Sequence, residues 1–153
     1  MDNDKVISIF NDLIETCRDG QEGFKEASEN ATSPELKSFF LEASRGRARC
    51  VGELQQEVRT LGGDPEKTGS TAGALHRVWM DIKGTLTGKD DASILNEAER
   101  GEDSAVKAFE DALKKGLPAN SRATVQKQFS EIKLTHDRVK QMRDSKSATA
   151  ARK

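Results

Sequence analysis

The sequence is poor in residues that interrupt or cross-link helices, with three prolines and two cysteines among 153 residues. Because proline ends or kinks most helices, so few prolines allow long uninterrupted helices. Two cysteines are too few for the disulfide framework of a small secreted domain. No apolar run approaches membrane-spanning length, and the start of the chain, MDNDKVISIF, is acidic and amphipathic, unlike a signal peptide. We therefore expect a cytoplasmic protein.

Neither sign of charge is in excess, because 25 Lys and Arg residues nearly balance 26 Asp and Glu residues. Such a balance supplies no basic surface for nucleic acid or for an anionic membrane. We expect no nucleic-acid partner and no membrane, which leaves a homodimer or other homo-oligomer as the candidate assembly. What the sequence does have is a third of its residues charged and 34% hydrophobic, at the length of one domain. These values are typical of a soluble helical protein.

Apolar residues recur in alternating steps of four and three, which places them on one face of a helix. The first such stripe begins with Val6, Phe10, Leu13 and Cys17. Four stripes of this kind predict an all-α protein. The expected helices span about 4–31, 34–61, 91–115 and 119–144. They form one domain over residues 1–145, and we expect a flexible basic tail over 146–153.

The connections between these helices predict their arrangement. The first and second helices are joined by very few residues, and so are the third and fourth, so each pair forms an antiparallel hairpin. The long connection, residues 62–90, contains a shorter amphipathic helix at about 70–87. Its apolar side carries Leu75, Val78, Trp79, Ile82 and Leu86. A short, long, short pattern is that of a ferritin-like four-helix bundle with one crossover between helices two and three. The alternative is a sequential up-and-down bundle, with the connection as a fifth helix or a lid.

Polar residues interrupt the apolar stripes at one level of the bundle. Gly20 is expected to face Arg47 across the first hairpin, and its missing side chain leaves room for the guanidinium. Glu102 lies on the buried stripe of the third helix, with Glu99 one turn earlier, and His136 lies on the fourth helix. An isolated buried carboxylate is unfavourable, so Glu102 is expected to meet a cation. We therefore predict one buried polar layer of these five residues.

Three interpretations of this layer compete. It can be an ion-pair network that fixes helix pairing. Glu99, Glu102 and His136 can instead hold one divalent ion, such as iron or manganese, or a small ligand can fill the space beside Gly20. A di-iron site requires Glu-x-x-His sequences on two helices, but Lys133 stands three residues before His136, and the second helix has no histidine. We expect no catalytic residue and no cofactor, and iron or manganese remains the alternative.

The two cysteines form a further candidate site. Cys17 and Cys50 are expected to face each other across the first hairpin, either as a reversible disulfide or as two small buried thiols. His76 is expected at the surface or at a helix cap, and Trp79 is expected to fasten the connection to the bundle. With two histidines in the chain, no nucleophilic motif is evident, which disfavours a hydrolytic enzyme.

Several stretches resemble an uncharacterised bacterial family of ferritin-like four-helix-bundle proteins, known as a domain of unknown function. The resemblance covers roughly residues 4–144 and is carried by LIETCRDGQEGF, VRTLGGDPEKTGSTAGALHRVWMDIK, AERGEDSAVKAFEDAL and EIKLTHDRVKQMRD. It implies a fold related to ferritins and rubrerythrins in a bacterial cytoplasmic protein, and it implies no reaction. The expected function is that of a structural, interaction or stress-related bundle without a di-iron site. The alternatives are a metal-binding oxidoreductase or metal store, and small-ligand binding in the core.

Overall fold

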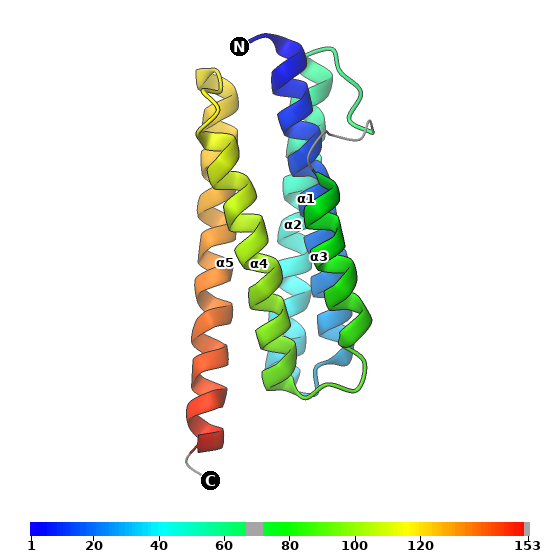
Figure 1. The fold of residues 1–153 in the computed structure, drawn as a ribbon, viewed down its shortest axis with the longest axis vertical. Helices are drawn as coiled ribbons and strands as arrows, with labels where there is room; N and C mark the ends of the chain where they lie inside the picture. The colour runs from blue at the N-terminus through cyan, green and yellow to red at the C-terminus, as the bar shows by residue number, and fades with distance from the viewer. Residues whose placement is uncertain (67–71, 152–153) are drawn as a thin grey trace.

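The computed structural model describes residues 1–66 and 72–151, which contain five α-helices and no strand. The prediction of an all-α protein is therefore confirmed. The helices are α1 (Asn3–Asn30), α2 (Pro34–Thr60), α3 (Ala72–Thr85), α4 (Asp91–Leu113) and α5 (Ala119–Ala151) (Figure 1). None of the described helices is both long enough and apolar enough to cross a membrane.

Short polar side chains fix where the helices begin. Asp2, Ser33 and Asp90 each accept a hydrogen bond from a backbone N–H in the first turn of α1, α2 and α4. These are good N-cap residues because their oxygens satisfy amides that have no partner within the helix. Gly62 follows α2 with a φ of +84°, a left-handed conformation that favours glycine.

The last helix is longer than its sequence pattern predicts. We expect α5 to end at about residue 144, but it continues to Ala151. The added segment, SKSATAA, has no glycine or proline and includes three alanines, and alanine is the strongest helix former. The helix therefore extends into the segment predicted as a flexible basic tail over 146–153, and the flexibility of that segment stays a prediction.

The helices run alternately along one long axis (Figure 1). α1 and α2 form one antiparallel hairpin, and α4 and α5 form another. α3 lies beside α1 and α4, opposite in direction to α2, so it returns the chain to the end where α4 begins. As a result, α2 and α4 run in the same direction.

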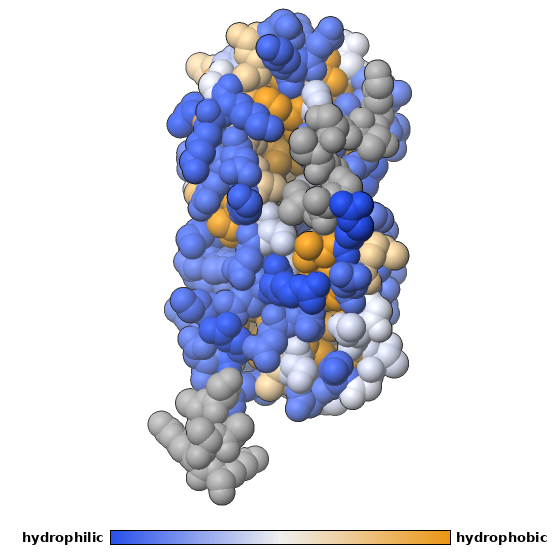
Figure 2. Space-filling view, in the orientation of Figure 1, coloured by the Kyte–Doolittle hydropathy of each residue, from blue (hydrophilic) through white to orange (hydrophobic). Residues whose placement is uncertain are grey.

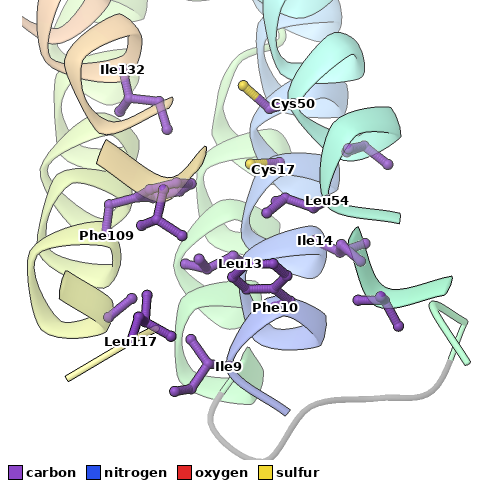
Figure 3. Packing of buried hydrophobic residues seen from close by; sticks show 14 of the residues in the cluster. Ile9, Phe10, Leu13, Ile14, Cys17, Cys50, Leu54, Phe109, Leu117 and Ile132 are labelled. Atoms are coloured by element: carbon purple, nitrogen blue, oxygen red, sulfur yellow. The ribbon is translucent and has the colours of Figure 1, made fainter. Parts of the chain in front are cut away.

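Two apolar clusters fill the interior. One surrounds Phe10, Leu54 and Phe109 and includes both cysteines (Figure 3). The other surrounds Phe24, Phe40 and Trp79. The side chain of Leu75, expected on the apolar side of α3, lies outside the described residues. Val78 packs against the second cluster, and Ile82 and Leu86 belong to it, as their spacing predicts.

Asp91, at the start of α4, ties the second hairpin to the first. Its carboxylate accepts hydrogen bonds from the backbone amides of Thr32 and Ser33 at 2.8 and 3.0 Å, and from the Thr32 hydroxyl at 3.1 Å. Burial alone raises the pKa of Asp91, but these hydrogen bonds outweigh it, so the pKa lies below its ordinary value. The carboxylate therefore closes the bottom of the bundle across the α1–α2 turn.

Replacing Asp91 with alanine is expected to lower the free energy of unfolding by about 1 kcal/mol at neutral pH. Because its folded-state pKa is depressed, the stabilisation by this carboxylate is present above the ordinary pKa of aspartate. It is lost as the pH falls through the depressed value. Urea denaturation of both proteins at neutral and acidic pH measures the difference, with Glu110→Ala as an exposed control on the same helix. A difference that persists in strong acid would contradict the charge-dependent contact.

Candidate functional site

A buried ion pair lies between the two apolar clusters. Arg47 Nη2 on α2 lies 2.5 Å from Glu102 Oε2 on α4, and the two side chains are 4% and 0% exposed. The guanidinium also lies 5.3 Å from the centre of the Phe24 ring. Burial disfavours the charged form of Arg47, but attraction to Glu102 outweighs it and keeps the pKa above its ordinary value. The carboxylate that the sequence places on an apolar stripe therefore meets a buried cation.

Gly20 accommodates this arginine. A Cβ atom at Gly20 would lie 2.9 Å from Arg47 Nη1, closer than a side-chain carbon can approach without displacement. The space beside Gly20 is thus filled by Arg47 itself, and we do not propose a ligand cavity there.

The Arg47–Glu102 pair also leaves two polar atoms without a hydrogen bond within the described part of the chain, Arg47 Nη1 and Glu102 Oε1. Such buried unsatisfied groups cost free energy.

The other two members of the predicted layer lie elsewhere. His136 binds Asp103 and Asp137, with nitrogen–oxygen distances of 2.6 and 3.1 Å, and Glu99 pairs with Arg143 on α5. The prediction of one continuous layer with Arg47 and Glu102 is therefore wrong for Glu99 and His136. Successive side chains on a helix differ in direction by about 100°. Glu99 and Glu102 therefore point in different directions from α4, and of the two Glu102 points to the interior.

A second cluster forms at the seam between α4 and α5. One ligand atom from each of Glu99, Asp103 and His136 lies within 4.8 Å of the others. Burial lowers the pKa of His136, but hydrogen bonds to Asp137 and Asp103 outweigh it, so the pKa lies above its ordinary value. The ligand set predicted from the sequence contained Glu102, and the structure replaces it with Asp103. The i, i+4 spacing from Glu99 to Asp103 was the signal available in the sequence.

The residues at the centre do not fit a di-iron group. Such a centre needs several carboxylates and histidines projecting inward from four helices. Here Glu102 is the buried carboxylate at the level of the ion pair, and the guanidinium of Arg47 lies against it. A fixed cation at bonding distance from the carboxylate repels a metal ion. We therefore derive no chemistry through such a group.

The two thiols lie one layer from the ion pair. Cys17 and Cys50 are both free and buried, and their side chains come from neighbouring helices with the sulfur atoms turned to the same side (Figure 3). A hydrogen bond with Cys50, together with burial, raises the pKa of Cys17 well above its ordinary value. The same hydrogen bond lowers the pKa of Cys50, despite burial. The pKa values of the two thiols are thus shifted in opposite directions.

The residues expected on the connecting helix also have defined positions. His76 is largely exposed, and its Nδ1 lies 2.8 Å from Asp19 Oδ1. Trp79 is buried between α1 and α4, where Cβ atoms at Gly23 or Gly101 would lie 2.2 or 2.3 Å from its ring. The expected anchoring role of Trp79 agrees with this position. The two glycines that form its slot were not predicted, although glycine inside a helix is unfavourable and therefore calls for a reason.

The geometry defines an all-α protein whose hairpins are joined by an internal ion pair and an inserted tryptophan. The chain belongs to the family described as a domain of unknown function, DUF2383, which it matches over residues 5–115. The matched range includes Arg47, Glu102 and both cysteines, whereas His136 lies beyond it. No curated protein matches the chain.

Proposed function

We propose that this chain is a ferritin-like four-helix bundle that serves a structural or interaction role in a bacterial cytoplasm, without a di-iron site. In this proposal α1, α2, α4 and α5 are the bundle helices and α3 is the crossover. The support is the parallel direction of α2 and α4 and the short, long, short pattern of connections. These are the features of a bundle with one crossover.

The observation that carries the proposal is the Arg47–Glu102 pair at the centre of the helices. Within a bundle, the two charges satisfy each other only when α2 and α4 are neighbours at the correct height. Any other helix order or register leaves an unpaired charge in the interior, which is strongly unfavourable. A charge pair of this kind therefore specifies a single arrangement, which suits a bundle that presents a fixed outer surface. We propose a second copy of the chain as the partner, which size-exclusion chromatography with light scattering tests.

The second candidate function is binding of one divalent cation, iron or manganese, at Glu99, Asp103 and His136. It is favoured because one ligand atom from each of these three residues lies within 4.8 Å of the other two. A histidine nitrogen and two carboxylate oxygens suit such ions, with water completing the coordination. Against it, Arg143 already pairs with Glu99, so a bound ion would have to compete with that guanidinium. We therefore rank this function second.

Metal analysis separates the two functions. We expect protein purified from cells supplied with iron and manganese to contain far less than one metal ion per chain. If the seam cluster is a metal site, the protein will hold about one ion per chain, and His136→Ala and Asp103→Asn will remove it. Asp111→Asn, an exposed change on the same helix, is the matched control. Bound metal would also be released as the pH falls through the raised pKa of His136, because protons then compete for the ligand nitrogen.

A further inference from the structure

The two helices that carry the cysteines approach each other closely. Ser44 Oγ on α2 donates a hydrogen bond of 2.8 Å to the backbone carbonyl of Gln21 on α1. A short side chain that reaches the backbone of the next helix requires the two helix axes to be near one another. Cys17 and Cys50 belong to this same interface and to one apolar cluster. Their side chains come from these neighbouring helices with the sulfur atoms turned to the same side (Figure 3), an arrangement that suits closure of a disulfide.

One of the two thiols borders a surface groove. A hollow of about 310 Å³ between α2 and α5 is lined by Cys50 and Arg47, with Arg49 and Glu131 also in its wall. Cys50 is itself 1% exposed, and Cys17 is fully buried in the core behind it. A molecule as small as hydrogen peroxide can thus reach Cys50 from the groove with slight side-chain movement. Cys17 is 0% exposed and is not among the residues that line this groove.

Two charged groups border Cys50 and suit its reaction. Glu131 Oε2 lies 3.7 Å from Cys50 Sγ and accepts a hydrogen bond from the thiol. Arg47 lines the same groove and is 3% exposed, and its Nη1 has no hydrogen-bond partner within the described residues. A carboxylate can take the thiol proton, and a nearby fixed cation stabilises the thiolate that forms. Ion pairing with Glu102 satisfies the other half of the guanidinium, so the free nitrogen is an unexplained feature of the core.

We infer that Cys17 and Cys50 are a peroxide-reactive thiol pair, in which Cys50 is oxidised first and Cys17 then closes a disulfide between α1 and α2. This inference goes beyond the proposed structural role and does not depend on it. The oxidant is hydrogen peroxide or a small organic hydroperoxide that enters the α2–α5 groove. The cross-link would hold the first hairpin together covalently.

The reaction proceeds in two balanced steps. Glu131 takes the proton of Cys50, and the thiolate sulfur attacks one peroxide oxygen. The O–O bond breaks, an S–O bond forms, and the departing hydroxide takes the proton back from Glu131 as water. The sulfur of Cys17 then attacks Cys50 Sγ, so an S–S bond forms and the S–O bond breaks, and the thiol proton leaves with the hydroxyl group as a second water. Two thiols are oxidised and one peroxide is reduced to two waters.

The pKa directions agree with these separate roles. Cys50 has the lowered pKa and therefore more thiolate at neutral pH, as a first-reacting cysteine requires. Cys17 has the raised pKa, which suits the thiol that attacks second. Glu53 and Glu131 oppose the thiolate of Cys50, whereas Arg47 favours it.

The test uses the wild-type chain, which has two cysteines, so an internal disulfide has a single possible identity. The reduced protein is treated with a small molar excess of hydrogen peroxide, denatured, and alkylated with N-ethylmaleimide. We expect two labels before oxidation and none after it, a mass loss of two hydrogen atoms, and full recovery of labelling with dithiothreitol. Two thiols that remain fully alkylated after peroxide, or a cross-linked dimer on a non-reducing gel, would overturn the inference.

Variants test the roles of the two thiols. Cys17→Ser is expected to accumulate a sulfenic acid at Cys50 that dimedone captures, whereas Cys50→Ser is expected to leave Cys17 without a dimedone adduct. The opposite pattern would overturn the assignment. Glu131→Gln keeps a hydrogen-bond acceptor but cannot take the proton, so the oxidation rate should fall by roughly tenfold or more. Glu110→Gln, an exposed control on α4, should leave the rate unchanged, and equal rates in both variants would contradict the role of Glu131.

Discussion

Glu102→Gln is expected to lower the free energy of unfolding by about 3–5 kcal/mol, which is a large share of the stability of a domain of this size. The glutamine side chain has nearly the same shape, so packing changes little. What changes is charge: Arg47 stays cationic and fully buried, with its carboxylate 2.5 Å away replaced by a neutral amide. Equilibrium denaturation with urea, followed by circular dichroism, measures the loss. The slope of the transition should remain that of the wild type, because the surface exposed on unfolding is unchanged.

The matched experiment replaces both charges. Arg47→Met together with Glu102→Leu is expected to unfold within about 1 kcal/mol of the wild type, since apolar residues of similar volume remove both desolvation costs. Glu97→Gln is the surface control, because Glu97 pairs with the half-exposed Arg100 and exposed pairs contribute little. If Glu102→Gln alone were as stable as this control, the buried pair would not be an essential contact of the fold.

The repeat of apolar residues predicted the helices, and the cost of an isolated buried carboxylate predicted that Glu102 meets the cation Arg47. Both residues lie on stripes whose spacing defines the buried face, so their direction follows from the period of the helix. Glu99 and His136 lie at the border of a stripe, where a small rotation of α5 decides the partner. In the structure Glu99 pairs with Arg143, and His136 pairs with Asp103. The periodicity of one helix contains no information about the rotation of its neighbour, so this seam could not be predicted.

The position of Trp79 shows a second limit of prediction from the sequence. Its burial followed from the apolar side of the connecting helix, but the surface that receives it depends on where that helix returns along the bundle. The structure places its ring between Gly23 on α1 and Gly101 on α4. Two glycines in the interior of long helices were visible in the sequence as unfavourable choices. Their shared partner lies on a third helix, which only the tertiary arrangement brings between them.

Trp79→Ala is expected to lower the free energy of unfolding by about 3–5 kcal/mol, because it leaves a cavity where a fully buried indole now packs against Phe24. Gly101→Ala should also destabilise the wild type, by about 1–3 kcal/mol, since the added carbon would lie 2.3 Å from the Trp79 ring and must displace it. The chain has one tryptophan, so a red shift of its fluorescence in Gly101→Ala reports that displacement directly.

Combining Trp79→Ala with Gly101→Ala tests whether Gly101 is needed to make room for the Trp79 ring. In the Trp79→Ala background, Gly101→Ala no longer meets a ring, and alanine is a better helix former than glycine by up to about 1 kcal/mol. The same substitution should therefore stabilise the variant although it destabilises the wild type, which is a coupling between residues in contact. Gly52→Ala is the matched control, because nothing lies within 4 Å of a Cβ atom at Gly52 in α2. It should be equally stabilising in both backgrounds. A Gly101→Ala effect of the same sign and size in both backgrounds would mean that contact with Trp79 is not the reason for a glycine at position 101.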